Sequence, residues 1–269
     1  MNTLLNIADG QMNHDIDLLL QKKLPFDNAL ICGIRIGSET CSRMLEFIDA
    51  NDMALLIEKI KVRGYKAYVV FPDICQHQWD YARKLLDICY EKKADRIVVN
   101  DYGMLFEANE RFRNKVILGR MFDRRMRDPR CGTSWKEGLK KEESNLGSQE
   151  YRQLYKREQL CGIEMECFGS MDSIPSSWKV YVHIPYLLLT HGRICEFGGI
   201  QKSQESRYRL DSCHHQCQIV KSTGTAAFMK GVWYQRQNAL YTTIKRETLS
   251  HLLEQYHFLT PIFTHWQDD

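Results

Sequence analysis

Short apolar segments alternate with amphipathic segments from residue 28 to residue 184, and this repeat constrains the fold more than any other feature. The apolar segments are rich in β-branched residues and too short for helices, which is typical of buried strands. The amphipathic segments carry apolar residues at helical spacing. The strands are expected at 28–37, 66–71, 95–100, 115–119, 161–167 and 179–184, and the helices at 52–64, 77–93, 103–112 and, as a short one, 171–178.

Strands that alternate with helices predict a parallel sheet covered by helices. With 269 residues, the chain has a length typical of a (β/α) barrel. We therefore expect an α/β fold with a TIM-like barrel, closed or nearly closed, rather than an open doubly wound sheet. The expected barrel core is about 28–200 within a single domain, 1–269. A C-terminal extension of about 195–269 is expected to contain strands at 228–242 and a last helix at 247–258.

The composition describes an ordinary globular protein. Hydrophobic residues make up 43%, charged residues 26%, and the net charge is +3, which argues against a disordered chain or a polycation. Neither a secretory leader nor an apolar run long enough to span a membrane is recognisable. We expect a cytoplasmic protein without strong affinity for nucleic acid. Because cytoplasmic thiols stay reduced, the ten cysteines raise the question of metal binding.

Four cysteines follow expected strand ends or cluster in one short segment. Cys41 follows the first strand and Cys195 follows the strand at 179–184, while Cys213 and Cys217 lie four apart in DSCHHQC. In a barrel the carboxyl ends of the strands meet at one rim, so these thiols can converge. Four thiolates suit an iron–sulfur cluster.

Zinc is the alternative, because His214 or His215 could replace one of these thiolates. Spacing by itself leaves zinc and iron–sulfur open. Among the other cysteines, Cys32 and Cys89 lie on apolar faces and are interpreted as core residues. Position alone does not assign the rest, which are Cys75, Cys131, Cys161 and Cys167.

Three segments resemble the collagenase-like peptidase family (peptidase U-type), most closely its UbiV-like members, which act in oxygen-independent ubiquinone hydroxylation. They are GSETCSRMLEF at 37–47, HIPYLLLTHGRICEFGGI at 183–200, and DSCHHQC at 211–217 with the following GVWYQRQNALY. The resemblance covers about 28–245, but only these segments are specific. It implies a 4Fe-4S cluster held on a barrel-like fold by Cys41, Cys195, Cys213 and Cys217.

The resemblance also implies an activity and a partner. Relatives hydroxylate an aromatic ring or RNA bases without dioxygen, with prephenate implicated as the oxygen donor, and UbiV pairs with a homologous subunit, UbiU. We therefore expect an oxygen-independent hydroxylase, or one subunit of a UbiU-like heterodimer, acting on a small organic substrate. The segment HGRIC departs from the family pattern at His191 and Gly192, which affects the substrate more than the cluster.

Two other functions stay open. The chain could be a non-catalytic, cluster-bearing partner of a homologous catalytic subunit. A peptidase is less favoured, because a cysteine peptidase needs a thiolate paired with a histidine and no segment shows such a pair recognisably. Catalytic acids and bases are not assigned by the sequence.

Candidate substrate contacts come from polar residues at expected strand ends. Each has an ordinary alternative: a helix cap, a loop anchor or a hydrogen-bonded core histidine. Arg120 is the first choice for an anion contact, because guanidinium groups bind carboxylates in pairs of hydrogen bonds. The basic segment Arg120, Arg124, Arg125, Arg127 and Arg130 is either a solvated loop or an anion clamp. The candidates are Arg120, His183, Asn100, Asp101 and Glu166, with Gln235 and Asn238 as residues that face the cluster or shape a turn.

Overall fold

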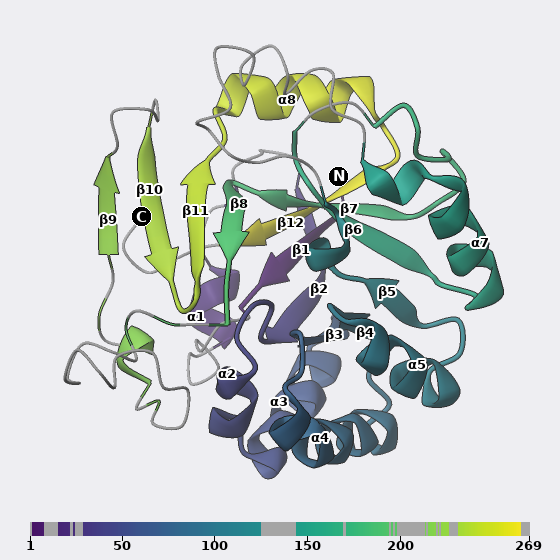
Figure 1. Ribbon diagram of the computed structural model, residues 1–269, viewed down its shortest axis with the longest axis vertical. Helices are drawn as coiled ribbons and strands as arrows, with labels where there is room; N and C mark the ends of the chain where they lie inside the picture. Colours follow the sequence, from purple (N-terminus) through teal and green to yellow (C-terminus); the bar gives the residue numbers. More distant parts are fainter. Residues whose placement is uncertain are drawn as a thin grey trace.

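The computed structural model shows a closed barrel of eight parallel strands with helices around it and a second, four-stranded sheet at one side (Figure 1). This confirms the predicted TIM-like α/β barrel. The structure describes residues 2–7, 16–21, 24, 29–124, 144–168, 171–193, 195, 197, 213, 215–218, 220, 222–225 and 231–264.

The barrel strands follow one another around the barrel in chain order, and the last strand pairs with the first. They are β1 (Asn2–Asn6), β2 (Leu30–Gly37), β3 (Lys66–Phe71), β4 (Arg96–Val99), β5 (Val116–Leu118), β6 (Gly162–Glu166), β7 (Val180–Ile184) and β12 (Leu259–Thr264). The helices are α1 (Ile16–Leu20), α2 (Arg43–Phe47), α3 (Ala50–Val62), α4 (Trp79–Glu91), α5 (Tyr102–Arg111), α7 (Gln149–Arg157) and α8 (Arg246–Gln255).

Two barrel strands lie outside the expected core of 28–200. β1 pairs with β2 on one side and with β12 on the other, so the two ends of the chain close the barrel. Strand β12 contains Pro261 opposite Val182 of β7. Proline lacks the N–H that a central strand normally donates, and this weakens the strand signal of 259–264. The barrel core therefore extends close to both ends of the chain.

The predicted short helix at 171–178 is wrong, because these residues form turns between β6 and β7. The segment contains Pro175 and the pair Ser176–Ser177, and these residues compete with helical hydrogen bonding. The helix predicted at 247–258 is shorter than expected, since α8 ends at Gln255. The three residues after it form the turn that leads into β12.

Alternate residues of the strands face opposite sides, as the period of two requires. In β3, Val69 and Phe71 pack with the helix layer, whereas Tyr68 and Val70 face the barrel interior. Both sides of the strand are buried. This explains why the strand reads as one continuous apolar run.

The barrel interior has two chemically different halves. The half at the amino ends of the strands, called the apolar half below, consists of Leu4, Tyr68, Val70, Val98, Ile117, Tyr181 and Ile262. The half at the carboxyl ends, called the charged half, contains Arg35, Glu39, Arg120, Glu164, Glu166 and His183, each at most 2% exposed. In TIM barrels the carboxyl ends carry the active site.

A second, antiparallel sheet lies beside the barrel (Figure 1). Its strand order is β8-β11-β10-β9, with β8 (Tyr186–His191), β9 (Ser222–Thr225), β10 (Val232–Arg236) and β11 (Ala239–Thr243). Strand β8 begins two residues after β7 ends, so this sheet starts at the carboxyl end of the barrel. Tyr186 and Leu188 of β8 pack with Tyr241 of β11 and with Met121, which follows β5.

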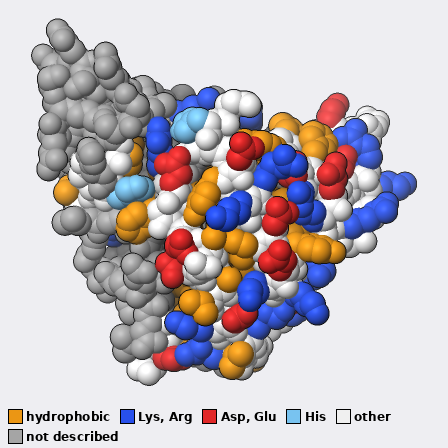
Figure 2. Space-filling view, turned by 90° about the horizontal axis from the view of Figure 1, so that it is seen from below, with side chains coloured by type: hydrophobic (Ala, Val, Ile, Leu, Met, Phe, Trp, Pro, Cys, Tyr) orange, Lys and Arg blue, Asp and Glu red, His pale blue; other side chains and the backbone are white. Residues whose placement is uncertain are grey.

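Charges of both signs are mixed over the visible helical face in Figure 2. Three ion pairs link α3, α4 and α5 or the residues at their ends: Lys92–Glu58, Arg83–Glu107 and Arg111–Asp87. Such exposed pairs add little stability, and the mixture is that of a solvated surface. Within the described part of the chain, the helices are all too short or too polar to cross a bilayer.

Candidate functional site

Arg35 of β2 is the centre of the charged half. Its guanidinium holds Glu164 of β6 through two hydrogen bonds, from Nε at 3.0 Å and from Nη2 at 2.8 Å. Nη1 donates to Asn6 Oδ1 at 2.6 Å and to Glu39 Oε1 at 2.5 Å. Because Arg35 is fully buried, these carboxylates supply the charge compensation that a guanidinium needs away from water.

Arg120 repeats this arrangement on the neighbouring side of the barrel. It holds Glu166 through two hydrogen bonds, from Nε at 2.7 Å and Nη2 at 2.6 Å, and Glu39 through Nη1 at 3.1 Å. Nη2 also donates to the carbonyl oxygen of Tyr186, and the guanidinium lies 5.7 Å from the ring centre of Tyr241. Arg120 therefore connects the barrel interior to the second sheet.

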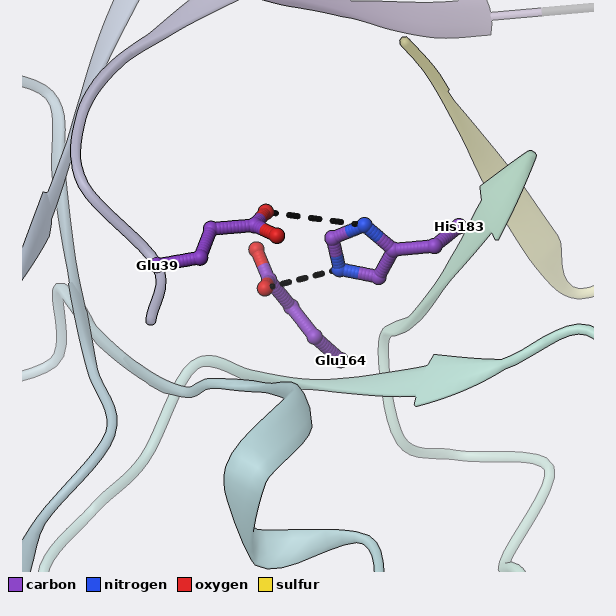
Figure 3. A group of neighbouring side chains, drawn as sticks. All are labelled: Glu39, Glu164 and His183. Carbon is purple, nitrogen blue, oxygen red and sulfur yellow. Dashed lines mark hydrogen bonds and ion pairs between the residues drawn. The ribbon is translucent and has the colours of Figure 1, made fainter. Parts of the chain in front are cut away.

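The two ring nitrogens of His183 of β7 face two carboxylates, those of Glu39 and Glu164 (Figure 3). Its Nε2 is 3.1 Å from Glu164 Oε2, a hydrogen bond, whereas Nδ1 is 3.6 Å from Glu39 Oε1 and has no hydrogen-bond partner. Glu164 is an acceptor, so Nε2 carries the hydrogen of the neutral imidazole. Nδ1 then presents a lone pair towards Glu39.

Among its described residues, the charged half has more carboxylates than guanidinium groups when His183 is neutral. Glu39, Glu164 and Glu166 are three carboxylates beside the two guanidinium groups of Arg35 and Arg120. The buried Asp123, which accepts hydrogen bonds from Ser144 Oγ and from the backbone N–H of Glu166, adds to this excess. A proton on His183 would reduce the imbalance.

The pKa values in this half follow from burial and charge. Burial raises the pKa of Glu39, but the positive charges of protonated His183, Arg35 and Arg120 outweigh it and hold the pKa well below its usual range. For His183, burial and Arg120 lower the pKa, and the opposing effects of Glu39 and Glu164 do not restore it. His183 is thus neutral at pH 7.

Glu39, Glu164 and His183 are also a possible ligand set for a metal ion, since one atom from each lies within 4.8 Å of the others. Two carboxylates and an imidazole suit a divalent transition metal. However, Arg35 already donates hydrogen bonds to both carboxylates. The guanidinium supplies the positive charge that an ion would bring, so we interpret the group as a charge network.

Two of the predicted ligand cysteines act electrostatically on a third, Cys41. Burial raises the pKa of the Cys41 thiol, and the thiols of Cys195 and Cys217 raise it further, so both lie within electrostatic range of Cys41. Cys41 is buried, and the other three predicted ligands, Cys195, Cys213 and Cys217, are partly buried and not in disulfides. The structure brings distant parts of the chain together here.

The loop that carries Cys41 is anchored on both sides. The Ser38 hydroxyl donates to the Cys41 carbonyl oxygen at 3.0 Å and accepts from the Cys41 N–H at 3.3 Å. Asn238, in the turn between β10 and β11, donates to the Thr40 carbonyl oxygen at 2.7 Å. The Cys195 thiol donates to the carbonyl oxygen of Gln237 in the same turn at 3.4 Å.

The sequence-predicted site residues divide into two groups. Arg120, Glu166 and His183 belong to the charged half, as described above. Asn100 and Asp101 make structural contacts: Asn100 donates to the Phe71 carbonyl oxygen and accepts from the Met121 N–H, and Asp101 caps α5 and also accepts from the Ile74 N–H. These contacts are those of a loop anchor for Asn100 and of a helix cap for Asp101.

The remaining candidates lie in varied places. Gln235 pairs with Leu240 inside the β10–β11 hairpin, and His215 packs its ring against Phe47. Cys89 and Cys167 are in the hydrophobic core, Cys32 and Cys161 flank the apolar half, and the Ser42 hydroxyl donates to Cys75 Sγ at 3.6 Å. The predictions for Cys131, His214, Arg125, Arg127 and Arg130 concern residues outside the described part of the chain.

Sequence reasoning missed Arg35, Glu39 and Glu164. All three interrupt or follow apolar runs, in LICGIRIG, IGSETC and GIEME. A charged residue at an inward position of a buried strand is rare unless it is paired, and this is the signal that could have found Arg35 and Glu164. Their partners could not be named, because they come from separate strands.

Comparison with protein-family models, with curated proteins and with solved structures gives no match. The fold and the site geometry are therefore the observations available for a functional proposal.

Proposed function

We propose that this protein binds a 4Fe-4S cluster through Cys41, Cys195, Cys213 and Cys217 at the carboxyl end of its barrel. In this proposal it works as an oxygen-independent hydroxylase, or as the cluster-bearing subunit of one, on a small organic substrate. The observation that carries the proposal is that the β10–β11 turn contacts two cysteine segments: the Cys195 thiol donates to the Gln237 carbonyl oxygen, and Asn238 donates to the carbonyl oxygen of Thr40, beside Cys41. The pKa of Cys41 also responds to Cys195 and Cys217. These three cysteines come from the β2 end, the segment after β8 and the segment before β9.

The donor set fits the cofactor. Four cysteine thiolates are the usual ligands of a 4Fe-4S cluster, and the described cysteines form no disulfides. Burial and mutual repulsion raise the pKa of Cys41 in the cation-free protein. A bound cation removes this penalty, because ligand thiols bind as thiolates. A four-iron cluster is larger than one ion, so its ligand sulfurs do not need the close spacing of a mononuclear site.

The chain's own residues have separable tasks in this proposal. Ser38 and Asn238 hold the Cys41 loop in place through hydrogen bonds to Cys41 and Thr40. When bound, the cluster supplies one-electron chemistry. The charged half, two residues away along the chain from Cys41, supplies ionisable groups on the barrel side.

A peptidase is disfavoured by the same geometry. A nucleophilic cysteine needs a lowered pKa, whereas burial raises the pKa of Cys41 and Cys89. The pKa of Cys32 and that of Cys161 are raised by burial as well.

A non-catalytic, electron-carrying subunit is the second candidate, and one observation favours it. Arg35 and Arg120, the cations best placed to bind an anionic substrate such as prephenate, are each held by two hydrogen bonds to the chain's own glutamates. A substrate carboxylate would have to displace them. In this second version, a UbiU-like homologous partner binds the substrate.

The experiment is anaerobic purification followed by iron and acid-labile sulfide analysis. About four irons and four sulfides per chain are expected from the four-thiolate cluster type. Cys41→Ser and Cys217→Ser should each lose most of the iron. Cys161→Ser is the matched control, because this partly buried cysteine flanks the apolar half, and its iron content should stay unchanged.

Two results would contradict the proposal. Stoichiometric zinc without sulfide would assign the thiols to zinc, and equal iron loss in all three variants would show that folding rather than ligation was lost. Calorimetry with prephenate then separates the two roles. Binding by this chain alone supports the hydroxylase, and binding only after a homologous partner is added supports the electron-carrying subunit.

A further inference from the structure

The loop from Ser38 to Cys41 joins the two unusual parts of the molecule. Glu39 points into the charged half and contacts His183, Arg35 and Arg120. Cys41, two residues later, belongs to the cysteine group. Two residues of chain span at most about 7 Å, so a charge that enters the cysteine site is close to the charged half.

His183 offers a position for one more proton in this half. Nε2 donates to Glu164, and Nδ1 is buried, faces Glu39 Oε1 at 3.6 Å and makes no hydrogen bond. Protonation would turn Nδ1 into a donor whose positive charge lies 3.6 Å from the Glu39 carboxylate. Figure 3 shows both ring nitrogens facing the glutamates that would share the imidazolium charge.

We propose that His183 is a redox-linked proton acceptor: it takes one proton from solvent at Nδ1 when one electron enters the cysteine-bound cluster from a one-electron donor. This inference rests on the proposed cluster. One electron and one proton are taken up together, so the net charge of the region is unchanged, and oxidation releases both. No covalent bond other than Nδ1–H forms or breaks.

The surroundings of His183 explain why the proton would arrive with the electron. The charged groups around it are Glu39 from the loop after β2, Arg35 of β2, Arg120 after β5, and Glu164 and Glu166 of β6. Strand β12, on its other side, presents Ile262 opposite His183. Burial and Arg120 lower the pKa of the imidazole and favour its neutral form. An added negative charge favours the imidazolium, because an opposite charge stabilises the charged form.

The decisive measurement is the midpoint potential of the cluster-loaded protein as a function of pH, followed by its visible absorption. Wild type should show a segment with a slope of about 59 mV per pH unit, the value for one electron coupled to one proton. His183→Gln should remove the slope. His251→Gln on α8 is the matched control, because His251 is exposed, and it should keep the slope.

A second measurement does not need the cluster. NMR of ring-labelled histidine in the iron-free protein reports the proton on His183, and Glu39→Gln should lower the pKa of His183, because it removes the carboxylate that faces Nδ1. This variant keeps the proposal testable even where His183→Gln folds poorly.

The outcomes separate this inference from the proposed function. A loaded cluster with a pH-independent potential, or a slope that persists in His183→Gln, overturns the proton role and leaves the cluster intact. An unchanged His183 pKa in Glu39→Gln also overturns it. Absence of iron and sulfide overturns both proposals.

Discussion

The two halves of the barrel interior are filled by different kinds of side chains. The apolar half fills the space with side chains such as Leu4, Val70 and Ile262, which need no specific partner. The charged half fills it with two arginines whose guanidinium groups are each held by a glutamate through two hydrogen bonds. Apolar packing depends on volume, whereas a buried ion pair depends on each partner being present.

This difference indicates which half of the barrel interior is the candidate for a function. Replacing a buried ion network with apolar residues is often neutral or stabilising in proteins, so stability alone does not explain the charged half. It lies at the carboxyl ends of the strands, where barrels carry their sites, and next to the loop of Cys41. We interpret it as a functional element.

Breaking the charged half should have the largest effect. Arg35→Met leaves Glu164 and Glu39 without their main buried cation, and we expect a loss of about 3–5 kcal/mol in the free energy of unfolding, measured by urea denaturation. The matched control is Arg83→Met, which removes an exposed ion pair with Glu107 and should cost less than about 1 kcal/mol. Equal small losses would contradict this picture.

Breaking the apolar half should cost slightly less and respond differently to pH. Ile262→Ala leaves a cavity in a fully buried position, and the expected loss is about 2–5 kcal/mol. The loss should be the same at pH 5.5 and pH 8, because no charge is involved. The Arg35→Met loss should shrink at pH 5.5 as its unpaired glutamates take up protons, and identical pH behaviour of the two variants would count against the distinction.

A methyl group added at Gly162, which lies beside Tyr181, tests the packing of the apolar half. A Cβ on Gly162 would lie 2.9 Å from a ring carbon of Tyr181, closer than two carbons can comfortably approach. Gly162→Ala should therefore cost about 1–3 kcal/mol. In the double variant Gly162→Ala with Tyr181→Leu, the clash is gone. Its loss in the free energy of unfolding should therefore be smaller than the sum of the losses of the two single variants. Strict additivity in a double-mutant cycle would rule this explanation out.

The smallest expected effect is the pH dependence of stability that His183 produces. The pKa of His183 is lowered in the folded state. Below about pH 6.5, the pKa in the unfolded chain, His183 therefore binds a proton more readily in the unfolded chain than in the folded protein. Stability should fall on acidification by at most about 1.4 kcal/mol per pH unit from this group. Glu39, whose pKa is also lowered, adds a further loss below about pH 4.3.

The check is urea unfolding between pH 5 and 8, above the range in which Glu39 contributes. His183→Gln should flatten the curve, and His251→Gln should leave it unchanged. A wild-type curve that is level from pH 8 to pH 5 would show that His183 does not titrate differently in the two states.

The barrel's central strands and helices could be predicted without a structure, because strands buried on both sides require continuous apolar runs and covering helices require an amphipathic pattern. It also indicated Arg120, Glu166 and His183 as residues at strand ends. These signals are local in the chain, so they can be read without a structure.

The closure of the barrel and the partners of its buried ion pairs could be learned from the folded structure alone. The pairing of β1 with β12 joins Asn6 to Thr264 across 258 residues, and Pro261 weakens the local strand pattern. The pairs Arg35–Glu164 and Arg120–Glu166 join residues 129 and 46 positions apart. Such partners have no sequence spacing of their own, because the circular order of the strands brings them together.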